Sequence, residues 1–206
     1  MGVHCCDHHH DDAEINSPRW RRALWIALVL NAGMFLIEII AGIAAGSSAL
    51  EADALDFFAD TATYAVSLFV AGMSLSWRNR VALYKGISMT LLGMWILSGA
   101  IWHLLLGIVP QSHVMGVVGA LAMMTNVGVA VILYKFREGD ANMHSVWICT
   151  RNDAIGNVAV LLAALGVFGT GTGYPDYIVA MIMATLSIIA GLQVMHRVHK
   201  ERVLLC

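Results

Sequence analysis

The amino-acid sequence predicts an all-α membrane protein with six transmembrane helices and both termini on the cytoplasmic side. Hydrophobic residues make up 59% of the 206 residues, and charged residues only 13%, which is about half the charged fraction of a typical soluble domain. Six apolar segments are each long enough to cross a hydrocarbon core, which needs about 20 residues. Basic residues lie in alternate connections between these segments, as expected for a chain with one orientation in the membrane.

The segments follow one another with short turns. The first is an apolar run that begins after three arginines, and the second begins after the turn residues "GSS". A basic connection precedes the third, which ends at "VPQSH", and the fourth starts beyond that break. A second basic connection leads into the fifth, and "GTGTGYPD" separates the fifth from the sixth. Such short breaks predict antiparallel neighbouring helices. The expected ranges are Ala23–Gly46, about Ala49–Trp77, about Gly86–Val109, about Val114–Tyr134, about Ser145–Phe168 and about Tyr177–His196.

Positive charge orients these helices and divides the chain. All but one of the 12 Lys and Arg residues fall before the first helix, after the sixth, or in the second-to-third and fourth-to-fifth connections; Arg151, in the fifth helix, is the exception. The positive-inside rule then places both termini in the cytoplasm. We expect a His/Cys-rich cytoplasmic tail at 1–18, a six-helix transmembrane domain at 19–199 and a short cytoplasmic tail at 200–206. The amino terminus lacks the apolar core of a signal peptide.

Three aspartates interrupt the second apolar segment. Asp53, Asp56 and Asp60 are spaced i, i+3 and i+7, which places them on one stripe of a helix. An unpaired charge near the bilayer centre costs at least about 2.5–3.5 kcal/mol. The stripe therefore needs a cation, a proton or water. A water-facing helix end, or protonated carboxyls packed against neighbours, is the alternative interpretation.

The fifth segment supplies partners for the stripe. Cys149 and Asp153 are spaced i, i+4 on one face, and Asn157 extends that face by one turn. Between antiparallel helices, Asp60 is expected to be level with Cys149, and Asp56 with Asp153. Three carboxylates and a thiol could then form a four-coordinate site for a divalent metal, with Asp53 and Asn157 as auxiliary candidates. Cys149 could instead be a small packing residue.

Two motifs in these helices resemble those of the cation diffusion facilitator family of metal/proton antiporters. "GSSALEADALDFFAD" is similar to the family's second-helix pattern, with Asp56 and Asp60 at its metal-ligand positions. "NMHSVWICTRNDAIGN" is similar to the start of its fifth helix, with Asp153 at the acidic ligand position. Asp176 resembles the acidic residue that begins the family's sixth helix. The resemblance extends over all six helices, from about Arg19 to His199.

The sequence departs from the family pattern in ways that bear on metal preference and assembly. Cys149 stands where the family usually has His or Asp, which favours Zn²⁺ or Cd²⁺ if the thiolate binds. If it does not, three carboxylates with Asn or water suit Mn²⁺ or Co²⁺ better. The chain ends at Cys206, so the family's cytoplasmic metal-sensing domain is expected to be absent. The resemblance also implies a homodimer.

The amino terminus, "HCCDHHHDD", is rich in metal ligands. We interpret it as a metal-capture tail; a disordered tail that binds metal opportunistically and a cloning remnant are the alternatives. Its candidate ligands are His4, Cys5, Cys6, His8, His9 and His10.

Together these features predict a metal efflux transporter rather than an enzyme. Because carboxylates and thiols bind metal when deprotonated, metal binding should release protons. We expect Zn²⁺ or Cd²⁺ efflux by proton antiport with alternating access, in a bacterial inner membrane. The lipid bilayer and the metal are the partners, with no prosthetic group and no nucleic acid. A membrane-anchored metal sensor or chaperone, which would depend on the tail, and a passive cation channel are the alternatives. Glu38 is a weak candidate partner for Arg151.

Overall fold

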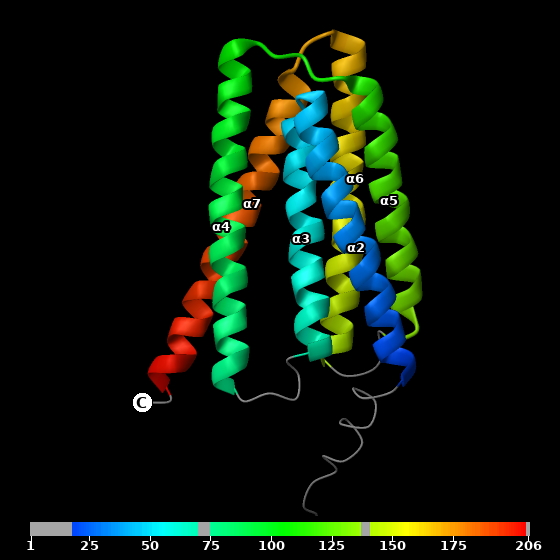
Figure 1. The fold of residues 1–206 in the computed structure, drawn as a ribbon. Coiled ribbons are helices and arrows are strands. Elements are labelled where there is room, and N and C mark those ends of the chain that lie inside the picture. The colour runs from blue at the N-terminus through cyan, green and yellow to red at the C-terminus, as the bar shows by residue number, and fades with distance from the viewer. Residues whose placement is uncertain (1–17, 70–74, 137–140, 205–206) are drawn as a thin grey trace, which may run out of the picture.

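The computed structural model describes residues 18–69, 75–136 and 141–204, so the His/Cys-rich tail lies outside the described residues. Within these ranges the chain forms six helices and no strand, which confirms the predicted all-α fold of six helices; the orientation of the termini stays a prediction. Each connection is short, and successive helices run in opposite directions (Figure 1). The helices are α2 (Pro18–Ala45), α3 (Ser48–Phe69), α4 (Leu75–Leu106), α5 (Ser112–Tyr134), α6 (Ala141–Thr170) and α7 (Tyr174–Leu204).

Several helix boundaries differ from those expected from the sequence. The second helix was expected to reach Trp77, but α3 ends at Phe69 and Trp77 belongs to the first turn of α4. The other helices mostly extend beyond the expected apolar segments, and α7 continues to Leu204. Hydropathy marks only the part of a helix that contacts lipid, whereas Arg, Lys, Gln and Glu continue a helix readily in water. The helix ranges expected from hydropathy are therefore too short at the polar ends of the helices.

Four helices have the length and composition of membrane spans among the residues that the structure describes. These spans are Pro18–Ala45, Arg80–Leu106, Ser112–Tyr134 and Tyr174–Lys200. α3 carries Glu51 and the three aspartates, and Gly156–Thr170 is the apolar part of α6 among the described residues. α3 and α6 contact one another inside the bundle. The lengths and composition of the four spans indicate an integral membrane protein.

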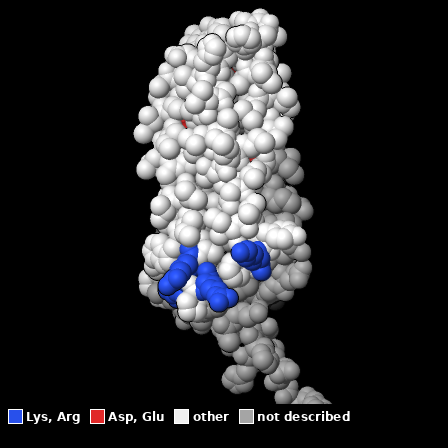
Figure 2. All heavy atoms as spheres, turned by 90° about the vertical axis from the view of Figure 1, so that its right-hand side faces the viewer, with Lys and Arg blue, Asp and Glu red and all other residues white. Residues whose placement is uncertain are grey.

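Large apolar side chains cover the outside of the bundle. Val29, Ile40, Leu105, Val117 and Phe168 are each more than half exposed, as expected for side chains that face lipid tails. In Figure 2 the visible surface carries almost no acidic atoms along its length. The acidic groups are instead in the interior, where Glu38, Asp53 and Asp176 are all fully buried. The polarity of the protein is therefore inverted relative to a soluble domain.

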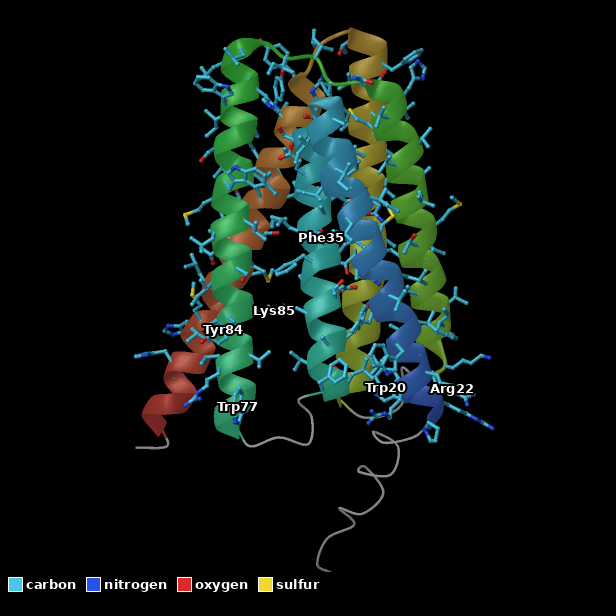
Figure 3. The ribbon with its side chains drawn as sticks, viewed as in Figure 1. Trp20, Arg22, Phe35, Trp77, Tyr84 and Lys85 are labelled. Carbon is cyan, nitrogen blue, oxygen red and sulfur yellow. The ribbon has the colours of Figure 1, made fainter. Side chains whose placement is uncertain are left out.

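Basic side chains gather at one end of the bundle, called here the basic end; the opposite end is the distal end. Figure 2 shows Lys and Arg grouped near this end on one face. Figure 3 shows Arg22 extending away from the bundle there, whereas Trp20 is 1% exposed and packs inside it. The described basic side chains at this end are Arg19, Arg21, Arg22, Arg80, Lys85, Lys135 and Lys200.

The helices associate in pairs around α3. The most extensive contacts are between α4 and α7, between α2 and α3, and between α5 and α6. α3 also contacts α4, α5, α6 and α7, so it lies at the centre of the arrangement. In Figure 1, α4 and α7 lie to one side of the other four helices. This division places the face of α3 that carries the aspartates against α2 and α6.

A hydrogen-bonded cluster joins α7 to the start of α3 at the distal end. Asp176 accepts hydrogen bonds from Ser47 Oγ (2.6 Å) and from the backbone N–H groups of Ser48 (2.9 Å) and Ala49 (3.1 Å). These amides belong to the first turn of α3, where backbone N–H groups have no carbonyl acceptor within their own helix. Asp176 therefore caps α3 from another helix. Ser48 Oγ also pairs with His103 Nδ1 at 3.0 Å, which brings α4 into the cluster.

Candidate metal site

The aspartate stripe predicted from spacing lies inside the bundle. Asp53 is fully buried, Asp60 is 6% exposed and Asp56 is partly buried. All three belong to α3, which is a continuous helix from Ser48 to Phe69. One helix thus presents three carboxyl groups to its neighbours in the middle of a membrane-spanning bundle. Such charge is tolerated in a membrane interior only when it is paired or faces a functional cavity.

Asp60 has partners on two helices. Tyr64, one turn further along α3, donates its hydroxyl to Asp60 Oδ2 at 2.6 Å. The carboxyl of Asp153 on α6 lies beside that of Asp60 and interacts electrostatically with Asp60, Asp56 and, more weakly, Asp53. Adjacent carboxyl groups in a membrane interior need a proton or a cation between them. Oδ2 of Asp153 has no hydrogen-bond partner among the described residues.

The sequence predicts that Asp60 is level with Cys149 and Asp56 with Asp153. The side chain of Cys149 lies outside the described ones, so this pairing stays a prediction. Among the described side chains, Asp153 interacts with Asp60 and with Asp56, and Asp56 Oδ2 lies 3.8 Å from the position of a Cβ on Gly156. Sequence position fixes the face of each helix but not its displacement along the neighbour. Asp56 and Gly156 are neighbours across the α3–α6 contact.

The thiol of the predicted site lies outside the described side chains. Cys149 belongs to α6, and its backbone is one turn from Asp153 toward the basic end. The side chains of residues 141–152 are not described. Among the side chains that are described, no group of three or more His, Cys, Asp and Glu is arranged to hold one metal ion. The carboxyl groups of Asp56, Asp60 and Asp153 are neighbours, but their oxygens do not converge on one metal-binding position.

Glu38 is a member of the acidic cluster that the sequence interpretation did not place there. It was considered as a weak partner for Arg151, but its carboxyl interacts with Asp53 and, more weakly, with Asp56. Glu38 is fully buried in α2, and neither of its oxygens has a partner from a donor group in the described chain. The available signal was an acidic residue within a long apolar segment, which marks a functional position in membrane helices.

Asn157 is buried beside this cluster without hydrogen-bond partners. It is fully buried on α6, next to Gly156 and one turn from Asp153. Neither its Oδ1 nor its Nδ2 has a partner among the described residues. Buried amides almost always have partners, so Asn157 is a notable free donor and acceptor. Asn157 stays a predicted auxiliary ligand on the face of Asp153.

Comparisons with known proteins agree with the resemblance that the motifs carry. The model of the cation efflux transmembrane domain matches residues 24–198. The zinc transporter ZitB of Escherichia coli (strain K12) is 23% identical over 192 residues, with 87% of this chain and 61% of ZitB covered. A cadmium, cobalt and zinc/H⁺-K⁺ antiporter of Bacillus subtilis (strain 168) is 22% identical over 188 residues, with 84% of this chain and 60% of the antiporter covered.

The chain thus spans about three fifths of the length of these two relatives. The family match runs from the first turns of α2 to the last turns of α7 and includes every acidic residue of the buried cluster. On these grounds the chain belongs to the cation efflux family, also called the cation diffusion facilitator family.

Proposed function

We propose that this protein is a divalent metal cation efflux transporter that exchanges metal for protons. Its metal ligands are Asp56, Asp60 and Asp153, with Cys149 as the fourth. Family membership supports transport of metal cations. The names of the two relatives, a zinc transporter and an antiporter of cadmium, cobalt and zinc against H⁺ and K⁺, favour Zn²⁺, and after it Cd²⁺, as the substrate.

The carboxyl pair formed by Asp60 and Asp153 is the observation that carries this proposal. Two adjacent carboxyl groups in a membrane interior are tolerated when a proton or a cation lies between them, whereas metal binding requires both carboxylates deprotonated. Proton and metal therefore compete for the same oxygens. A site with this property exchanges one ion for the other whenever it opens to a different side of the membrane, which is the chemical requirement of an antiporter.

Helix packing supports an alternating-access mechanism. α4 and α7 form one extensively packed pair, and α3 contacts both this pair and the helices α2 and α6. Rocking of the α4–α7 pair against the remaining helices would change access to the α3 aspartates from the two ends. The arrangement of basic side chains supports a cytoplasmic basic end. We place the protein in a bacterial plasma membrane, as a homodimer, with the tail at 1–18 as a metal-capture segment.

The metal preference depends on the donor set. A thiolate from Cys149 with three carboxylates suits Zn²⁺ and Cd²⁺, whereas oxygen donors alone suit Mn²⁺ or Co²⁺. Cys149 is four residues before Asp153 on α6, about 6 Å away along the helix axis and on the same face. Its thiol is therefore within reach of the site as the fourth ligand.

Transport into proteoliposomes tests the proposal. Purified protein is reconstituted, a pH gradient is imposed, and uptake of Zn²⁺ and Cd²⁺ is followed for the wild type, Asp60→Asn and Cys149→Ser. Asp140→Asn and Cys206→Ser, at aspartate and cysteine positions outside the site, are the matched controls. We expect gradient-driven uptake in the wild type and both controls, its loss in Asp60→Asn, and a changed Zn²⁺/Cd²⁺ ratio in Cys149→Ser.

Other outcomes would assign the protein to another class. Uptake that ignores the pH gradient but requires Asp60 would indicate a passive channel. No uptake by any variant, together with metal binding that disappears when residues 1–12 are removed, would indicate a membrane-anchored sensor or chaperone.

A further inference from the structure

Two buried carboxyl groups lie beside the proposed metal site and are not used by it. Glu38 on α2 and Asp53 on α3 are both fully buried. None of their four oxygens accepts a hydrogen bond from the described residues. The two carboxyl groups nevertheless interact electrostatically with one another. Two unpaired carboxylates cannot remain adjacent in a membrane interior without a cation or a proton between them. The pair therefore has a place for a positively charged occupant.

The contact between α2 and α3 fixes the depth of this pair. A Cβ on Gly42 would lie 2.8 Å from Glu51 Cγ, so these two positions are level in the antiparallel helices. Glu38 is one turn from Gly42 toward the basic end, which brings it level with the turn of α3 between Asp53 and Asp56. Asp53 is about 4.5 Å from Asp56 along the helix axis, in the direction of the distal end. The pair thus follows the proposed metal site on the way to the distal end.

A third helix contributes a neutral oxygen at this depth. Gly156 of α6 is level with Asp56, because the Asp56 carboxylate is 3.8 Å from its Cβ position. Asn157 is the next residue, is fully buried, and has both side-chain atoms without a partner. It shares the face of Asp153, which is directed at the α3 aspartates. α2, α3 and α6 thus each bring an unsatisfied polar side chain to the same level of the bundle.

We propose that Glu38, Asp53 and Asn157 form a second divalent-cation position on the distal side of the Asp56–Asp60–Asp153 site. Two carboxylates and an amide oxygen are hard oxygen donors, which suit a divalent cation with water completing its coordination. The transported metal occupies this position after it leaves the first one. The inference rests on the proposed function, since it assigns a route to the metal that the first site binds.

Counting bound metal ions tests the inference. Purified protein in detergent is dialysed against Co²⁺, and bound Co²⁺ per chain is measured for the wild type, Glu38→Gln, Asp53→Asn and Asp60→Asn. Glu51→Gln is the matched control, because Glu51 is a buried acid on α3 that contacts Gly42 rather than the cluster. Because the tail at 1–18 also binds metal in the proposed function, the variants are compared with the wild type. We expect Glu38→Gln and Asp53→Asn each to bind one Co²⁺ fewer than the wild type, and Glu51→Gln to bind as many as the wild type. The affinity of the second position for Co²⁺ should fall by more than about tenfold in these two variants, since even the loss of a residue that only orients a ligand lowers metal affinity by about 10–100-fold.

Asn157→Asp adds a test of opposite sign. A third carboxylate should tighten Co²⁺ binding at the second position, and a residue with only a packing role would not have this effect. The inference is overturned if Glu38→Gln and Asp53→Asn bind as many Co²⁺ ions as the wild type with unchanged affinity, which would make the pair a proton-holding or structural element. Failure of the proposed function is distinguishable, because Asp60→Asn would then bind as many ions as the wild type.

Discussion

The cap that Asp176 provides for α3 gives a quantitative prediction that does not depend on the transported ion. In the Asp176→Ala variant, the N–H groups of Ser48 and Ala49 and the hydroxyl of Ser47 lose their acceptor. Ser48 is 1% exposed and Ala49 is fully buried, so water cannot replace the lost carboxylate. Each buried donor left without a partner costs about 1–3 kcal/mol, so we expect the two amides together to lower the unfolding free energy by about 2–6 kcal/mol.

Asp176→Asn should have a smaller effect than Asp176→Ala. An amide keeps one oxygen that can accept hydrogen bonds from Ser47 and Ala49, but it turns an N–H toward the amide of Ser48. We therefore expect a loss of about 1–3 kcal/mol, the cost of one unsatisfied donor. Thr172→Ala is the control, since the Thr172 hydroxyl bonds only to Thr170 in an exposed turn, and its effect should stay within about 0.5 kcal/mol.

Unfolding in mixed micelles, titrated with a denaturing detergent and followed by circular dichroism, measures these differences. The expected order of stability is wild type and Thr172→Ala, then Asp176→Asn, then Asp176→Ala. If Asp176→Ala unfolds at the same detergent fraction as the wild type, the three hydrogen bonds do not hold α7 against α3 and the reasoning is refuted.

Three further perturbations address the site and the helix contacts. Tyr64→Phe removes the donor to Asp60 Oδ2 and should weaken metal binding by about tenfold or more; unchanged binding by equilibrium dialysis would show that the phenol does not orient the carboxylate. Gly191→Val should destabilise the protein by about 1–3 kcal/mol or more, because even a Cβ there would lie 2.7 Å from Gly86 O; Gly99→Ala, with open space around it, should not, as detergent unfolding can check. Lys85→Met removes the 2.5 Å bond from Nζ to Thr63 Oγ1 that links α4 to α3, so hydrogen exchange in the first turns of α4 should accelerate; equal exchange rates would contradict this role.

The residues of α3 show what sequence patterns can predict. The i, i+3, i+7 spacing of Asp53, Asp56 and Asp60 identifies a stripe because helix geometry alone determines which residues share a face. The same reasoning placed Asp153 and Asn157 on one face of α6. Hydropathy gave the number and order of the helices, because a lipid-facing helix must be apolar over a fixed length.

Glu38 and Asp176 show what sequence patterns leave open. Which helix faces which, and at what register, depends on packing between segments distant in sequence, such as the approach of Asp56 to Gly156. Local periodicity contains no such information, so the sequence did not place Glu38 beside Asp53. The capping role of Asp176, which lies 128 residues from Ser48 in the sequence, likewise arises only in the folded bundle.

The central claim is that protons and metal compete for the Asp56–Asp60–Asp153 carboxyls, so that each crosses the membrane in exchange for the other. Simultaneous recording of metal entry and internal pH in the same proteoliposomes, after Zn²⁺ is added outside without an imposed gradient, tests it most directly. The account predicts that Zn²⁺ enters while the vesicle interior becomes more alkaline, and that both signals vanish together in Asp60→Asn. Zn²⁺ entry at constant internal pH would contradict it.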